Sequence, residues 1–383
     1  MDMLNQPQSI FDVIDALKRN GIPEKEYKRH INYYLDTKAR KNRIPLHGSF
    51  ELTPLCNLDC KMCYIHLNDS QFNIEDLLSV DEWKSIMKQS HEAGMIKATL
   101  TGGECLTYPG FNVLYAFLYN MGITPSLMSN GVLMNKEQIE FFKCYPPKSI
   151  QISLYGSSED AYERVTGKRV FNTVYNNLER LKEANLPVRI TITPNRFMVD
   201  DIHQLLEVSS SLNIPFYINS RLITPRENTG RALEDMSIEQ YVLTYKIQRE
   251  LIGNDETESY ETIEIPEENH EGISKRGLQC GGGRSSFNIK YDGSMSPCAS
   301  LYDLSADTLK MGFLDAWKYI NHLADNYPMP EECDECVYHD YCLLCPAIHK
   351  NANRIGHCDS KVCERTKRLV QQGIIKIGSS TNR

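Results

Sequence analysis

The chain has 383 residues, enough for two domains, and a formal net charge of −8. An acidic chain without a basic patch argues against nucleic-acid binding. No apolar run is long enough to predict a membrane span, and the N-terminus lacks the basic and apolar regions of a secretory signal, so we expect a cytoplasmic protein. Thirteen cysteines in such a chain indicate a reducing compartment and metal binding rather than disulfides.

Residues 1–47 are predicted to form a helical arm. Ile10, Val13, Ile14 and Leu17 recur at helical spacing, and Gly21-Ile22-Pro23 ends that helix. A second helix is expected over Glu24–Lys41. The arm carries no residues with evident chemistry, so we interpret it as a structural brace.

From residue 48 to 225 the pattern alternates between strand and helix. Helices are expected near 81–93, 110–120, 135–143, 159–184 and 200–211. Six such repeats predict an α/β fold, a parallel sheet that curls into a barrel or part of one, with its chemistry at the C-terminal ends of the strands. The six predicted strands are Ser49–Thr53, Ala98–Thr101, Pro125–Met128, Ser149–Leu154, Val188–Thr193 and Phe216–Ile223.

Three cysteines follow the first predicted strand. Cys56, Cys60 and Cys63 have the spacing C-x3-C-x2-C, which is unfavourable for disulfide geometry. Three thiolates on one loop can instead converge on an iron–sulfur cluster and leave one iron without a protein ligand. A zinc site is the alternative, with His66 as the fourth ligand.

This loop resembles the cluster-binding motif of radical S-adenosylmethionine (radical SAM) enzymes, including the aromatic Tyr64 after the third cysteine. The resemblance implies that the predicted sheet is a partial six-stranded (β/α)6 barrel. It also implies a 4Fe–4S cluster whose open iron binds the amine and carboxylate of S-adenosylmethionine. Reduction then cleaves the sulfonium C–S bond and gives a 5′-deoxyadenosyl radical. Tyr64 would lie against the adenine, although a buried aromatic side chain without a ligand is the alternative.

The loops after the next strands extend the resemblance. Gly102-Gly103-Glu104 resembles the family's GGE motif, in which the glycines allow close backbone approach and the carboxylate holds the methionyl amine. A tight strand-to-helix turn is the alternative. Ile152-Ser153-Leu154-Tyr155-Gly156 resembles the family's I-S-L-x-G, and Arg164 is either a cofactor contact or a solvated helix charge. The further S-adenosylmethionine contacts implied by the resemblance are Ser129, Asn130, Ser153 and Arg164.

Residues 226–275 are interpreted as a connector. A helix is expected over Ile238–Leu251, followed by the acidic stretch Glu256–Glu271. An acidic run is usually a solvated face, and a grip on a basic leader peptide is the alternative.

The second group of cysteines lies within residues 276–370, ahead of a tail over 371–383. Asp292-Gly293 between Phe287–Tyr291 and Met295 predicts a hairpin. The cysteine spacing is similar to that of the SPASM extension of radical SAM enzymes, except that its last gap is two residues rather than three. Zinc is again the alternative, with His339, His349 or His357 nearby. The cysteines are Cys280, Cys298, Cys333, Cys336, Cys342, Cys345, Cys358 and Cys363.

The SPASM resemblance implies two auxiliary 4Fe–4S clusters. Cys280, Cys298 and Cys345 would hold the nearer cluster. The farther cluster would be held by Cys333, Cys336, Cys342 and Cys363. Whether Cys358 completes the nearer cluster or exchanges roles with Cys363 stays open.

The predicted function is that of an oxidoreductase that cleaves S-adenosylmethionine and abstracts hydrogen from a ribosomally made peptide, forming a thioether or carbon–carbon crosslink. A flavodoxin or ferredoxin would supply the electron. The alternatives are a sulfatase-maturing formylglycine-forming enzyme, a small-molecule cofactor maturase, and a non-catalytic zinc or iron–sulfur scaffold.

No catalytic acid, base or radical-quenching residue is identified, and Asp292, Tyr155 and Cys105 are candidates by location alone. Cys105 and Cys144 are otherwise expected to be small buried side chains.

Overall fold

The computed structural model describes most of the chain. The described residues are 10–68, 70–220, 222–226, 229–230, 232–233, 235–252, 277–278, 280–333, 336–338, 342, 345, 347 and 356–375. The acidic stretch Glu256–Glu271, His339 and His349 lie outside them. No helix in the described ranges combines the length and the apolar character needed to cross a lipid bilayer.

The predicted N-terminal helices are confirmed. Helix α1 covers Ile10–Arg19 and α2 covers Glu24–Asn42. The chain then contacts α11 (Phe313–Asp325), where the Trp317 indole donates to the Arg43 carbonyl at 2.7 Å. An ion pair at 2.6 Å also joins Arg43 to Asp325, so the junction after the arm is fixed to the C-terminal part of the molecule.

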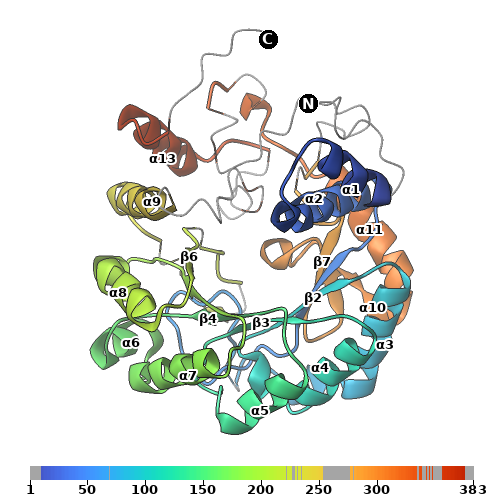
Figure 1. Cartoon of the computed structure of the whole chain (residues 1–383), viewed down its shortest axis with the longest axis horizontal. Helices are drawn as coiled ribbons and strands as arrows, with labels where there is room; N and C mark the ends of the chain where they lie inside the picture. Colours follow the sequence, from blue (N-terminus) through green and yellow to red (C-terminus); the bar gives the residue numbers. More distant parts are fainter. Residues whose placement is uncertain are drawn as a thin grey trace.

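Six parallel strands form the predicted partial barrel in sequence order, β6-β5-β4-β3-β2-β1. Helices α3 to α8 lie along the outer side of this sheet (Figure 1). The strands are β1 (His47–Glu51), β2 (Lys97–Thr101), β3 (Ser126–Ser129), β4 (Ser149–Ser153), β5 (Val188–Ile192) and β6 (Phe216–Ile218). The helices are α3 (Val80–Glu92), α4 (Phe111–Asn120), α5 (Lys136–Cys144), α6 (Glu159–Thr166), α7 (Phe171–Glu183) and α8 (Ile202–Leu212).

Two predicted elements differ from the structure. The expected helix over 159–184 is two helices, because Gly167 adopts φ +71° and ends α6. Glycine tolerates this left-handed conformation and commonly ends a helix. The sixth strand has only three residues, Phe216–Ile218, rather than the eight predicted. Pro225 cannot donate to a strand ladder and limits how far a strand could run.

The C-terminal part extends the same sheet. Strand β7 (Ser286–Ile289) pairs in parallel with β1, and β8 (Ser294–Ser296) and β9 (Ala306–Asp307) follow in antiparallel pairs. The predicted hairpin around Asp292-Gly293 is confirmed as β7–β8, with Gly293 at φ +80°. The sheet of the described residues therefore crosses the expected boundary between the barrel and the cysteine-rich region.

The remaining helices belong to the connector and the C-terminal part. Helix α9 (Ile238–Ile252) confirms the predicted connector helix and packs beside α13 (Ser360–Gln371). Asp235 ahead of α9 pairs with Lys361 at 2.8 Å and with Arg365 at 2.7 Å. Short helical segments are α10 (Thr308–Met311) and the 3-10 turns Ile74–Asp76, Cys105–Thr107, Val199–Asp201, Ala299–Leu301 and Glu331–Cys333.

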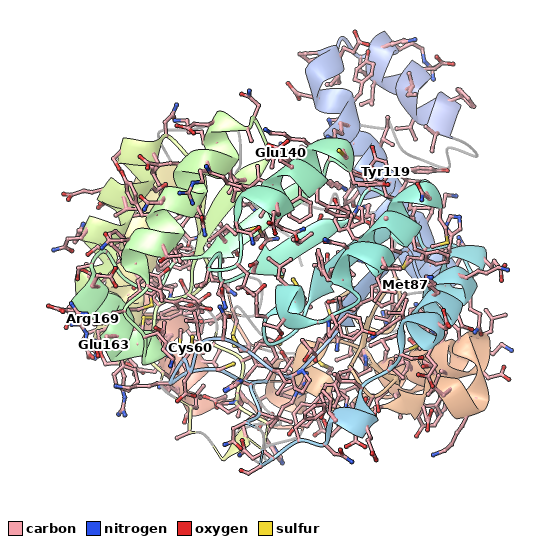
Figure 2. All side chains as sticks on the ribbon, turned by 90° about the horizontal axis from the view of Figure 1, so that it is seen from below. Cys60, Met87, Tyr119, Glu140, Glu163 and Arg169 are labelled. Carbon is pink, nitrogen blue, oxygen red and sulfur yellow. The ribbon has the colours of Figure 1, made fainter. Side chains whose placement is uncertain are left out.

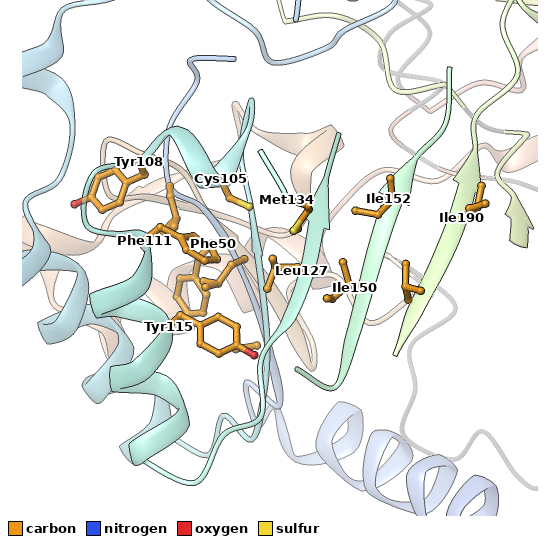
Figure 3. Packing of buried hydrophobic residues seen from close by; sticks show 14 of the residues in the cluster. Phe50, Cys105, Tyr108, Phe111, Tyr115, Leu127, Met134, Ile150, Ile152 and Ile190 are labelled. Atoms are coloured by element: carbon orange, nitrogen blue, oxygen red, sulfur yellow. The ribbon is translucent and has the colours of Figure 1, made fainter. Parts of the chain in front are cut away.

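The two faces of the sheet differ in chemistry. Phe50, Ile150, Ile152 and Ile190 are fully buried in the main hydrophobic cluster between sheet and helices (Figure 3). Phe50 meets the Trp83 ring of α3 edge-on at 5.9 Å. Successive side chains on a strand point to opposite faces. The alternate residues, which are largely polar, therefore face the concave side of the partial barrel.

Candidate functional site

The three-cysteine loop leaves the C-terminal end of β1, where a barrel of this kind places its chemistry. Backbone N–H groups donate to two of its sulfurs, from Leu58 to Cys56 Sγ at 3.4 Å and from His66 to Cys63 Sγ at 3.3 Å. Cys60 is buried. Within the described residues, no three His, Cys, Asp or Glu side chains are already gathered as a metal site.

The donor set of this loop suits a thiolate-bound cluster. N–H donors to the ligand sulfurs are among the features that tune iron–sulfur sites. Burial raises the pKa of the Cys56 thiol to about 12, so the protein alone keeps this group protonated. A bound cation reverses that preference, because a coordinating thiol is deprotonated outright. Cys56, Cys60 and Cys63 are therefore the residues that would hold the cluster.

Gly102 and Gly103 bring the loop after β2 against the start of the cysteine loop. The Gly103 N–H donates to the Thr53 carbonyl at 2.7 Å, and the Glu104 N–H to that of Leu55 at 2.9 Å. A Cβ at Gly102, where φ is +150°, would lie 2.6 Å from the Thr53 carbonyl oxygen. The two glycines thus permit a close approach to the chain itself, a role that the sequence analysis assigned to a ligand.

Glu104 is buried and joins the loops after β2 and β3. Its carboxylate accepts from the Asn130 N–H at 2.7 Å, the Leu106 N–H at 3.2 Å and the Ser129 hydroxyl at 3.0 Å. Burial raises the pKa of the Glu104 carboxyl, and these donors partly offset the rise. The predicted residues Glu104, Ser129 and Asn130 therefore come together in one hydrogen-bonded network.

Asn130 connects this network to the cysteine loop. Its side-chain amide donates to Asn57 Oδ1 at 2.7 Å and to Cys56 Sγ at 3.5 Å. The Asn130 Oδ1 in turn accepts from the Val132 N–H at 3.0 Å, which fixes the orientation of the amide. A chain of contacts thus leads from Glu104 through Asn130 to the sulfur of the first cysteine.

Tyr155 places the end of β4 beside the same loop. Burial raises the pKa of the Tyr155 phenol well above its ordinary value, and the neighbouring Cys60, Cys63 and Cys56 add to the rise. The nearby Ser153 side chain partly offsets this rise in the pKa of Tyr155. The predicted cofactor contact Ser153 and the candidate Tyr155 therefore lie at the cysteine loop.

A buried ion pair lies beside Tyr64, and no pattern in the sequence predicted it. The Arg226 guanidinium donates to both oxygens of Glu51 at 2.8 and 2.9 Å, and Asn288 of β7 donates to Glu51 at 3.1 Å. Arg226 is 4% exposed and Glu51 is fully buried. The guanidinium lies over the rings of Tyr64 at 5.5 Å and Tyr302 at 5.0 Å.

This ion pair, which we call the rim pair, connects four parts of the chain: the end of β1, the cysteine loop, the segment after β6 and the C-terminal strands. Burial alone lowers the pKa of Arg226, but Glu51 and Tyr64 outweigh it and the pKa is raised. The Arg226 N–H also donates to the Tyr64 carbonyl at 3.1 Å. The rim pair therefore fixes the backbone next to Cys63.

Two other predicted residues lie apart from this network. Arg164 is exposed and donates to the Phe197 carbonyl at 3.1 Å, after β5. His66, the fourth ligand of the zinc alternative, has its Nε2 3.8 Å from Asp59 Oδ1. Neither side chain is gathered with the three cysteines as a metal site.

The C-terminal cysteines are partly described. Burial raises the pKa of the Cys298 thiol to about 11, and the nearby thiols of Cys280 and Cys345 add to the rise. Cys363 lies on α13, and Cys358 lies just before that helix. Cys333 ends a short 3-10 turn. The remaining members of the set are Cys336 and Cys342, both half-buried.

The single cysteines and Asp292 were expected by location only. Cys105 is buried, and its thiol contacts the Met128 carbonyl at 3.5 Å. The expectation for Cys144 is wrong, because it is exposed where α5 ends. Asp292 pairs with Lys290 at 3.2 Å and accepts from the Ser294 N–H in the hairpin turn. Burial raises the pKa of Asp292, but Lys290 and Ser294 outweigh it and lower the pKa.

Comparison with known proteins agrees with this architecture. Residues 50–207 match the Radical SAM superfamily. The antilisterial bacteriocin subtilosin biosynthesis protein AlbA of Bacillus subtilis (strain 168) is 24% identical over 96% of this chain and 81% of its own length. The sporulation killing factor maturation protein SkfB of the same strain is 26% identical over 70% of this chain and 62% of its own length.

The fold also matches a solved structure. Streptococcus suis SuiB bound to S-adenosylmethionine superposes with a TM-score of 0.67, covering 92% of this chain and 86% of SuiB at 15% identity. The matched range 50–207 begins within β1 and contains the three-cysteine loop, the Gly102-Gly103-Glu104 turn and the loops after β3 and β4. Residues 50–207 of this chain therefore form a radical SAM domain.

Proposed function

We propose that this chain binds S-adenosylmethionine and a 4Fe–4S cluster at the cysteine loop and modifies a ribosomally made peptide by forming a thioether or carbon–carbon crosslink. The observation that carries the proposal is the contact chain from Glu104 through Asn130 to Cys56, at the C-terminal end of the parallel strands. When bound, the cluster supplies the electron that cleaves the sulfonium cofactor. Asn130 and the N–H groups of Leu58 and His66 orient the ligand sulfurs.

The peptide substrate is supported by the relatives. AlbA and SkfB carry names that refer to the biosynthesis of subtilosin and the maturation of a killing factor, and SuiB has been solved with its precursor peptide SuiA. We propose a peptide with a leader segment as the partner of this chain. A flavodoxin or ferredoxin is the proposed electron donor.

Two auxiliary 4Fe–4S clusters complete the proposal. The nearness of Cys280 and Cys345 to Cys298, whose pKa both thiols raise, supports the assignment of the three to the nearer cluster. Cys333, Cys336, Cys342 and Cys363 are proposed for the farther one. Cys358, which lies just before the helix that carries Cys363, is proposed either to complete the nearer cluster or to exchange roles with Cys363.

The test begins with anaerobically reconstituted protein, reduced with dithionite and incubated with S-adenosylmethionine. We expect 5′-deoxyadenosine, and about four iron atoms for each cluster. Peptides encoded beside the gene are then added, and a crosslinked product is detected by a mass lower by two hydrogen atoms. A colourless protein that contains zinc and makes no 5′-deoxyadenosine would refute the proposal. A product with formylglycine, or a modified small molecule, would replace the crosslinking assignment while keeping the reaction class.

A further inference from the structure

One arginine on the concave face of the sheet, Arg189, forms no ion pair with a carboxylate of the described residues. Leu127, Ile150, Ile152 and Ile190 point to the helix side of the sheet, as Figure 3 shows. Because side chains alternate along a strand, Arg189 of β5 points to the opposite, concave side. The parallel register pairs it with Gln151 of β4, which shares that face.

The Arg189 side chain is partly buried without compensation. Its Nε is inaccessible to solvent and has no hydrogen-bond partner, and no ion pair involves this residue among the described parts of the chain. The hydroxyl of Thr191, two residues further along β5, is also buried and unpartnered. A buried polar atom without a partner costs free energy, and the Arg189 Nε and the Thr191 hydroxyl are two such atoms among the described residues. The Arg189 guanidinium and the Thr191 hydroxyl could both donate hydrogen bonds to one anion, such as a carboxylate, that acts only as an acceptor.

Two neighbouring side chains on this face are accessible to solvent. Met128, which pairs with Gln151, is 44% exposed although it lies on a central strand. Tyr217, which pairs with Thr191, is 37% exposed. Both lie on the concave face by the same alternation of side chains. The solvent-accessible parts of the Met128 thioether and the Tyr217 ring can contact the aliphatic part of an acidic ligand.

Glu51, a carboxylate at the end of β1, does not pair with Arg189. Glu51 is occupied by Arg226 and Asn288 in the rim pair. Thr191 is in register with Ser153, the predicted cofactor contact, and Arg189 lies two residues earlier on its strand. Two residues of strand correspond to about 7 Å. An acid held by Arg189 would thus lie deeper in the barrel than the cofactor and below the reacting end of the site.

We propose that Arg189 and Thr191 form a carboxylate-binding subsite for the substrate, which we call the floor subsite. Its ligand is an acidic side chain or a terminal carboxylate of a peptide, accepting hydrogen bonds from the guanidinium and the hydroxyl. Met128 and Tyr217 contact the adjoining methylene groups. The proposal rests on the proposed peptide-modifying function, because that function places a peptide on the concave face.

The test uses the full-length, reconstituted protein and an equimolar library of synthetic peptides in matched pairs that differ by one Glu-to-Gln change. The peptides that stay bound to the protein are counted by mass spectrometry, and the ratio of bound Glu to bound Gln members is compared among the wild type, Arg189→Gln and Arg189→Lys. Arg169→Gln is the control, because Arg169 lies at the outer surface with Asp160 and Glu163 (Figure 2). We expect the wild type and the control to favour acidic members, and Arg189→Gln to lower that preference about tenfold. Arg189→Lys should retain part of it.

A second measurement separates substrate binding from cofactor binding. Cleavage of S-adenosylmethionine without peptide should keep its KM and kcat in Arg189→Gln. A wild type without acid preference, or a preference unchanged in Arg189→Gln, overturns the proposal. A raised KM for S-adenosylmethionine together with an unchanged peptide preference also overturns it and makes Arg189 a cofactor residue. If the wild type favours acidic peptides but never yields 5′-deoxyadenosine, the floor subsite stands and the proposed function fails.

Discussion

Arg226 at the rim of the barrel and Arg189 on its floor are arginines of the same concave side in opposite situations. Arg226 is bonded to Glu51 and lies over two tyrosine rings, so its charge is compensated within the protein. Arg189 has no such partner among the described residues. A charge that is paired within the protein, such as that of Arg226, stabilises the local structure. A charge that is not paired there, such as that of Arg189, is available to bind a ligand.

The largest expected effect is a loss of S-adenosylmethionine cleavage without a loss of the preference for acidic peptides. Cys63→Ala should abolish formation of 5′-deoxyadenosine, because it removes one of three proposed cluster ligands. The preference for acidic peptides should persist, since Arg189 lies on a different strand from the cysteine loop. Both are measured on the same preparation, by chromatography and by peptide retention. If Cys63→Ala cleaves S-adenosylmethionine at the wild-type rate, the cysteine loop does not bind the cluster and the proposed site is wrong.

The second prediction compares the two arginines directly. Arg226→Met should lower the free energy of unfolding by about 3–5 kcal/mol, because it leaves the Glu51 carboxylate buried without its cation. Arg189→Met should change it by less than about 1 kcal/mol, since no bond is lost there. Denaturant titration measures both variants. Equal losses of unfolding free energy in the two variants would show that Arg189 also has a structural partner, and the two arginines would then not differ.

The third prediction concerns Glu104, which joins the loops at the rim. Glu104→Gln should cost about 1–3 kcal/mol, because an amide N–H₂ then faces N–H donors from Asn130 or Leu106. Burial raises the Glu104 pKa in the folded state, so the folded protein binds the proton more tightly than the unfolded chain. The stabilisation of the wild type relative to the variant should therefore be greatest at low pH and fall as the pH rises above about 4.5, the ordinary value. Urea titrations across this range measure it, and a difference that grows with pH would contradict the assignment.

The smallest expected effect is at Cys144. Cys144→Ala should change the free energy of unfolding by less than about 0.5 kcal/mol, because the side chain is exposed at the end of α5. Cys105→Ala is the matched comparison, since that thiol is fully buried and contacts the Met128 carbonyl. We expect thermal unfolding to distinguish the two variants, with the larger loss at Cys105.

Much of the fold could be predicted because its signals are local. The alternating strand residues, the glycine and proline punctuation and the cysteine spacing all lie within short windows of sequence. The break between α6 and α7 is also local, since Gly167 marks it, but the apolar spacing continues across it and suggested one helix. The same local signal correctly placed Glu104, Ser129 and Asn130 at the ends of neighbouring strands.

The rest depends on contacts between distant segments. Glu51 reads as an ordinary strand residue and Arg226 as part of a polar linker, and only the folded chain brings them to 2.8 Å. The glycines of the Gly102-Gly103-Glu104 turn were interpreted by their effect on a ligand, because the approach of Thr53 and Leu55 cannot be inferred from the turn alone. Arg189 carried no signal, since an arginine within a strand does not reveal whether a carboxylate faces it.

The parallel pairing of β7 with β1 has a consequence for how the molecule can be divided. A chain cut ahead of β7 would expose the hydrogen-bonding edge of β1 over His47–Phe50, directly beside the cysteine loop. Unprotected strand edges recruit other chains and promote aggregation. The cysteine-rich part thus covers the β1 edge of the parallel sheet, and we expect the radical SAM domain to be prone to aggregation when it is produced without β7.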